Sequence, residues 1–115
     1  MFKFIALGAF ALTLLAAPAQ AERRVYSGTE AQALQCAAFL SYATYVMERR
    51  GLITFRNREE GALAATRILG RHVGGTFAQK QAAFQAVLNR LPDRETDIMD
   101  DSVRHMTWCT QRFLG

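Results

Sequence analysis

The sequence predicts an all-α protein, a small four-helix bundle of up-down-up-down topology with one disulfide. Apolar residues recur at helical spacing in four segments, Gly, Pro and helix-capping residues separate these segments, and two cysteines lie far apart in the chain. Four helices with short connections usually alternate in direction, which gives this topology.

The first segment is typical of a secretory signal peptide. Lys3 precedes an apolar run over residues 4–17, and a helix-breaking proline and small residues follow, up to Ala21. The run is shorter than the roughly 20 apolar residues that span a bilayer. We therefore expect cleavage after Ala21, which leaves residues 22–115 as one helical domain with no stable membrane anchor. The many Arg and Ala residues are typical of a GC-rich bacterial genome, so we expect a periplasmic or secreted bacterial protein.

Cys36 and Cys109 are the only cysteines, and export to an oxidising compartment predicts a disulfide between them. In the chain-entropy model, a bridge that closes a loop of about 74 residues stabilises a fold by roughly 4 kcal/mol. A reactive thiol is the alternative, but no neighbouring His and no CxxC motif would activate it.

The first predicted helix covers residues 28–50. Ser27 and Glu30 have the spacing of a capping box, and no Gly or Pro follows until Gly51. Its apolar residues form two adjacent faces, so little of the helix can face water. This predicts either the central element of the bundle or a helix that also meets another protein. One face consists of Leu34, Cys36, Ala37, Leu40, Ala43 and Met47, and the other of Phe39, Tyr42 and Val46.

The second predicted helix covers residues 58–73. Asn57 and Glu60 repeat the capping-box spacing, and Gly74 and Gly75 supply a stop. The expected inward face consists of Ala62, Leu63, Ala65, Ile68, Leu69 and Val73, and the small residues Gly61, Ala64 and Gly70 permit close approach to a neighbour.

Two further helices follow. Thr76 and Gln79 cap the third, and Pro92 ends it. The fourth covers residues 94–113, with acidic residues in its first turns and basic residues near its end, as the helix dipole favours. The expected inward residues are Phe77, Phe84, Val87, Leu88 and Leu91 in the third helix, and Ile98, Met99, Val103, Met106, Cys109 and Phe113 in the fourth.

No pattern in the sequence indicates catalysis, a metal or a cofactor. His72 and His105 lie on different predicted helices, without acidic residues spaced to complete a metal site. The G-x-S-x-G and CxxCH motifs are absent. The net charge of +4, or +3 without Lys3, is too small to indicate nucleic-acid binding. We therefore expect a protein that is not an enzyme.

The connector over residues 51–55, with the sequence GLITF, carries more apolar bulk than a loop usually does. In one interpretation its large residues plug an end of the bundle. In the other they are exposed and form an apolar centre with an arginine border, as in protein recognition sites. The candidate partner-binding residues are Leu52, Ile53, Phe55, Arg49, Arg50 and Arg56.

The leading hypothesis is a small exported protein that binds another protein. An inhibitor or immunity-type protein against a periplasmic toxin is one alternative, and self-association into a homodimer is left open. A second alternative is a small-molecule or lipid carrier, whose pocket in the bundle core would be lined by Phe39, Tyr42, Met47, Phe84, Met99 and Met106.

Overall fold

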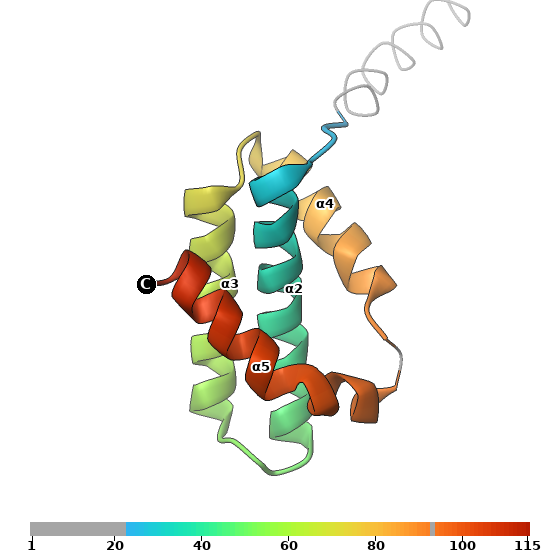
Figure 1. The fold of residues 1–115 in the computed structure, drawn as a ribbon, viewed down its shortest axis with the longest axis vertical. Helices are drawn as coiled ribbons and strands as arrows, with labels where there is room; N and C mark the ends of the chain where they lie inside the picture. Colours follow the sequence, from blue (N-terminus) through green and yellow to red (C-terminus); the bar gives the residue numbers. More distant parts are fainter. Residues whose placement is uncertain (1–22, 93) are drawn as a thin grey trace, which may run out of the picture.

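Four consecutive α-helices make up most of the computed structural model, which describes residues 23–92 and 94–115, and the backbone alone of residues 101–103. The predicted all-α class is confirmed. The predicted signal peptide, residues 1–21, lies outside the described residues. The helices are α2 (Gly28–Arg49), α3 (Phe55–His72), α4 (Phe77–Arg90) and α5 (Glu95–Phe113) (Figure 1).

Helix α2 is the central element. It packs against each of α3, α4 and α5, while the described parts of those three helices have few contacts with one another. Figure 1 shows α3 and α4 on either side of α2, and α5 crossing obliquely in front of α2 and α3. As predicted, little of α2 faces water, since its apolar residues are buried along most of its length. The buried residues are Ala33, Leu34, Cys36, Ala37, Ala38, Phe39, Leu40, Ala43, Thr44 and Val46.

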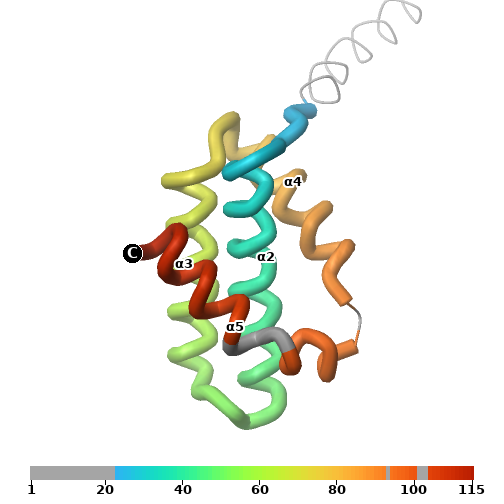
Figure 2. Tube along the Cα trace, in the orientation of Figure 1, coloured from blue at the N-terminus to red at the C-terminus, as the bar shows by residue number. Residues whose placement is uncertain are grey.

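The disulfide between Cys36 and Cys109 is confirmed, with Cα atoms 5.5 Å apart and both residues buried. It ties α5 to α2 near the middle of the molecule. In the tube of Figure 2 successive helices run in opposite senses, although α5 lies across the others. The regular up-down-up-down topology therefore remains a prediction.

Gly61 lets α3 approach α2 closely. A Cβ atom at this position would lie 2.6 Å from both Cγ2 and Oγ1 of Thr44. The Thr44 hydroxyl donates to the Leu40 carbonyl at 2.7 Å, so this side chain is fixed in place. The predicted close approach at Gly61 is confirmed, whereas a Cβ at Gly70 would have no neighbour within 4 Å.

Helix α3 begins earlier than predicted because Thr54 is its cap. The Thr54 hydroxyl accepts a hydrogen bond from the Asn57 N–H at 3.1 Å, which places Asn57 inside the helix. The prediction of Asn57 as the cap is therefore wrong. The capping box of Thr76 and Gln79 is confirmed, with both reciprocal hydrogen bonds formed.

Three residues expected to face inward are exposed. Helix α3 packs mainly against α2, so it buries only the narrow stripe of Ala65 and Ile68 and leaves Ala62 and Leu63 in water. Phe77 is 79 % exposed at the first position of α4.

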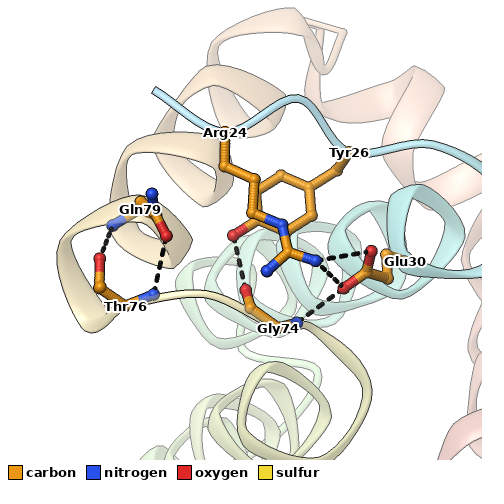
Figure 3. Close-up of polar contacts among 6 residues, drawn as sticks. All are labelled: Arg24, Tyr26, Glu30, Gly74, Thr76 and Gln79. Carbon is orange, nitrogen blue, oxygen red and sulfur yellow. Dashed lines mark hydrogen bonds and ion pairs between the residues drawn. The ribbon is translucent and has the colours of Figure 1, made fainter. Parts of the chain in front are cut away.

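Residues 23–27, which we call the N-terminal strap, close the amino end of α2 (Figure 3). The Tyr26 hydroxyl donates to the Gly74 carbonyl at 2.7 Å, and the Gly74 N–H donates to Glu30 Oε2 at 2.8 Å. The Arg24 guanidinium pairs with Glu30 at 3.2 Å and lies 5.0 Å from the centre of the Tyr26 ring. Both backbone polar groups of Gly74 are therefore satisfied by side chains.

The predicted capping box of Ser27 and Glu30 is wrong, because the Glu30 carboxylate takes part in this network instead. Ser27 is the N-cap of α2, but its side chain makes no capping hydrogen bond. The Glu30 carboxylate turns to Arg24 and to the Gly74 N–H, so it is not available to the Ser27 backbone.

Candidate functional site

The turn between α2 and α3 carries an exposed cluster of apolar and arginine side chains, which we call the hairpin tip: Tyr45, Arg49, Leu52, Phe55 and Arg58. Leu52 is 60 % exposed and Phe55 is 56 % exposed. Tyr45 is 40 % exposed on the last turns of α2. The interpretation of this segment as a buried plug is thus wrong for Leu52 and Phe55, and only Ile53 is partly buried.

Arginine side chains stack on the aromatic rings of the hairpin tip. The Arg58 guanidinium lies 5.3 Å from the centre of the Phe55 ring and 5.7 Å from that of Tyr45. Arg49 lies 5.7 Å from the same Tyr45 ring. At these distances a guanidinium is attracted to the negative face of the ring, by about 0.5–1 kcal/mol at exposed sites. These contacts join four side chains, Tyr45, Arg49, Phe55 and Arg58, into one surface.

Two glutamates balance part of the positive charge at this end. Arg49 and Arg50 each pair with Glu95 at 3.3 Å, and Arg58 pairs with Glu48 at 3.6 Å. A hydrogen bond with the Tyr45 side chain, and then the charge of Glu95, raise the pKa of Arg49. Because arginine is already protonated at neutral pH, these pairs position the side chain without changing its charge.

Of the predicted partner-binding residues, Arg49 lies at the end of α2 and Arg50 follows as its C-cap. Leu52 and Ile53 lie in the turn itself. Phe55 and Arg56 are the first residues of α3 rather than loop residues, and Arg56 is exposed. The structure therefore brings these residues to one end of the α2–α3 pair.

A groove of about 550 Å³ lies between α2, α4 and α5, and we call it the side groove. Its apolar lining comes from Phe39 on α2, Val87 and Leu91 at the end of α4, and Trp108 on α5, together with the disulfide. Its polar lining consists of Gln32, Gln35, Arg90, Arg104 and His105. None of the described lining residues is acidic.

Three of the six pocket residues predicted for a carrier, Phe39, Tyr42 and Met106, pack together in a small cluster with Ala43 and Ile98. Phe84 packs against the main core, which Met106 also contacts. Of the six, only Phe39 lines the side groove. The sequence reasoning missed Arg90, Arg104 and Trp108. The four-residue spacing of Arg104 and Trp108 places both on one side of α5, which is a signal that could have suggested them.

The two histidines are engaged in packing. A carbonyl oxygen can only accept a hydrogen bond, so the 2.9 Å contact between His72 Nε2 and the Phe113 carbonyl makes Nε2 the donor. The His105 ring lies 5.0 Å from the Phe39 ring, centre to centre. Within residues 23–92 and 94–115, no group of three His, Cys, Asp or Glu residues could hold a metal ion. In the same part of the chain, no helix combines the length and apolar character needed to cross a membrane.

Comparisons with known proteins do not assign the chain to a family, since no family model, no curated protein and no solved structure matches it.

Proposed function

We propose that this chain is an exported, non-enzymatic protein that binds another protein through the hairpin tip. The observation that carries the proposal is the joint exposure of Leu52, Phe55 and Tyr45 at this end of the α2–α3 pair. Arg58 lies over both the Phe55 ring and the Tyr45 ring.

Single exposed apolar residues are common on protein surfaces and need no explanation. The hairpin tip is different because it gathers several at a turn, and turns usually carry polar residues. Tyr and Arg are also the residue types most enriched among those that dominate binding energy at protein interfaces. An apolar centre surrounded by charged side chains is the usual layout of such an interface.

The charge balance indicates what the partner surface offers. Glu48 and Glu95 pair with three arginines and so neutralise part of the charge, which leaves the exposed apolar side chains as the main feature of the tip. We infer a partner with an apolar patch that covers Leu52 and Phe55, and with hydrogen-bond acceptors for the surrounding guanidinium groups.

Export is supported by the signal-peptide pattern that ends at Ala21 and by the disulfide, since disulfides persist mainly in oxidising compartments. We propose that the working protein is the chain over residues 22–115, in the bacterial periplasm or outside the cell. Protein recovered from its native compartment is then expected to begin at Glu22 and to resist alkylation at Cys36 and Cys109. A protein that still begins at Met1, or that has two reactive thiols, would contradict the export proposal.

Site-specific photocrosslinking tests the binding surface. The full chain is expressed in its own host with a benzophenone amino acid in place of Leu52, and in a parallel strain in place of Leu63. Leu63 is a matched control, since it is 58 % exposed against 60 % for Leu52 but lies further along α3. We expect a covalent adduct with one other protein from position 52 and none from position 63.

Once that protein is identified, Leu52→Asp is expected to weaken its binding by about 30-fold, the effect of losing a dominant interface residue, while Leu63→Asp leaves binding unchanged. Equal adducts from both positions would refute the assignment of the surface. An adduct of twice the mass of the chain would show self-association, and would overturn the proposal of a different partner.

A further inference from the structure

We propose that the side groove is a second binding site, independent of the hairpin tip, and that it binds a small amphiphilic anion, a carboxylate attached to an apolar chain. Three features of the groove support this site: its size, its apolar walls and its two arginines without carboxylate partners among the described side chains.

The groove has the size and lining of a ligand site. Pockets for small molecules usually measure about 300–1,000 Å³ and are mainly apolar with a few polar groups, and the side groove holds about 550 Å³. Phe39, Val87, Leu91 and Trp108 supply the apolar walls. The Trp108 side chain is 46 % exposed, so a large aromatic surface faces water there and a ligand would cover it.

The disulfide fixes two of the walls. Cys36 of α2 and Cys109 of α5 both line the groove and are joined covalently. Phe39 lies one turn beyond Cys36, and Trp108 is next to Cys109, so both aromatic residues are carried by helices that the bridge holds together. A site fixed before the ligand arrives loses less entropy on binding.

The lack of a carboxylate partner distinguishes the two groove arginines from four others. Arg24, Arg49, Arg50 and Arg58 each pair with a glutamate. Arg90 and Arg104, which enter the groove from α4 and α5, have no carboxylate partner among the described side chains. Two guanidinium groups beside apolar walls therefore offer charge-assisted hydrogen bonds to an anion that also carries an apolar body.

The polar groups present also define what the groove excludes. Besides the two arginines, the lining includes the amides of Gln32 and Gln35 but no described acidic group. A cationic ligand would find no counter-charge there, and an uncharged apolar ligand would leave both guanidinium groups without an anionic partner. An apolar carboxylate satisfies both parts of the lining.

Trp108 is the only tryptophan of the chain, so its fluorescence reports directly on the groove. We would titrate purified oxidised protein with decanoate below its micellar concentration. Decanol serves as the chain without the charge, and acetate as the charge without the chain. A saturable blue shift of the emission is expected with decanoate, at least tenfold weaker binding with decanol, and no shift with acetate.

Variants assign the effect to the groove. Arg90→Gln and Arg104→Gln are each expected to raise the Kd for decanoate by at least about tenfold, since each removes a charge-assisted hydrogen bond. Arg67→Gln on α3 is the matched control and is expected to leave the Kd unchanged, because Arg67 is exposed and is not among the lining residues. Circular dichroism would verify that all three variants keep their helix content.

The proposal is overturned if decanoate produces no saturable shift, if decanol binds as tightly as decanoate, or if neither groove arginine matters. Leu52→Asp separates this site from the hairpin tip, since it is expected to leave decanoate binding intact while it weakens protein binding.

Discussion

At the amino end of α2 side chains satisfy the backbone polar groups of Gly74, whereas at the carboxyl end aromatic and arginine side chains gather on one exposed turn. Apolar side chains are exposed at both ends, with Val25 in the strap at 90 %. Tyr26 of the N-terminal strap and Glu30 of α2 bind the two backbone groups of Gly74. At the other end Leu52 and Phe55 are more than half exposed. Helix α2 therefore begins beside polar groups that pair with one another and ends beside apolar side chains that stay exposed.

This contrast indicates that the two ends serve different needs. Hydrogen bonds to partly buried backbone groups contribute to stability, because a buried donor or acceptor without a partner is costly. An apolar side chain in water contributes little to stability, since its area has not been removed from solvent. The contacts of the strap are therefore explained by their contribution to stability, whereas the exposed side chains of the hairpin tip are better explained by binding. The predictions below test this difference.

The largest effect is expected from removing the disulfide, which lies between the two ends. Replacing both Cys36 and Cys109 by Ala is expected to lower the free energy of unfolding by about 4 kcal/mol, because the unfolded chain loses a long closed loop. Urea denaturation of the oxidised protein and of the double variant measures this difference. A loss of less than 1 kcal/mol would mean that packing alone holds α5, and that the strap supplies more of the stability than we infer.

At the closed end, Glu30→Ala is expected to lower the free energy of unfolding by about 1–3 kcal/mol, since it leaves the Gly74 N–H without an acceptor. The matched control is Glu60→Ala, an exposed glutamate of α3, which is expected to change stability by no more than about 0.5 kcal/mol. Thermal or urea unfolding compares the two variants. Equal losses would remove the distinction we draw for the strap.

The helix caps test both ends with a smaller change. Thr54→Ala at the hairpin tip removes a capping hydrogen bond, and a loss of about 1 kcal/mol is expected. Ser27→Ala at the closed end removes a hydroxyl that makes no capping bond, so the free energy of unfolding is expected to stay nearly constant. Urea denaturation compares the two variants. If Ser27→Ala lowers the free energy of unfolding as much as Thr54→Ala does, then the Ser27 hydroxyl caps α2 after all.

The smallest effect on stability is expected at the exposed aromatic residues. Phe55 and Phe77 each follow a capping threonine at the first position of a helix, and both are exposed. Phe77→Ser is expected to change the free energy of unfolding by less than about 0.5 kcal/mol, as for an ordinary surface position. Phe55→Ser is expected to lower it by up to about 1 kcal/mol, since it also removes the contact with Arg58. A loss above 1.5 kcal/mol for Phe55→Ser alone would show that it closes the bundle end after all.

Helical periodicity and the cysteine pair were sufficient to predict the four helices and the disulfide, because both depend on local spacing and on compartment. The caps were less predictable. Ser27 and Glu30 match a capping box, but Gly74, 44 residues beyond Glu30, competes for the carboxylate. Leu63 fits a helical stripe, yet α3 meets one main neighbour and buries only a narrow part of its surface.

The side groove could not be predicted in the same way. Its walls come from three helices, so its existence depends on how α5 crosses α2 and on where α4 ends. The hairpin tip was easier, since Leu52 and Phe55 are unusual for a connector in sequence alone. Only the structure showed that they are exposed and that Arg58 stacks on Phe55.

The central place of α2 has a consequence for how the molecule opens. Because α3, α4 and α5 each depend on α2 and have few contacts with one another in the described part of the chain, one outer helix can detach while the others stay folded. Helix α4 has one buried residue, Val87, and the disulfide does not tie it to α2. Its amide hydrogens should therefore exchange with solvent through partial opening well before those of α2, and each such event would also widen the mouth of the side groove.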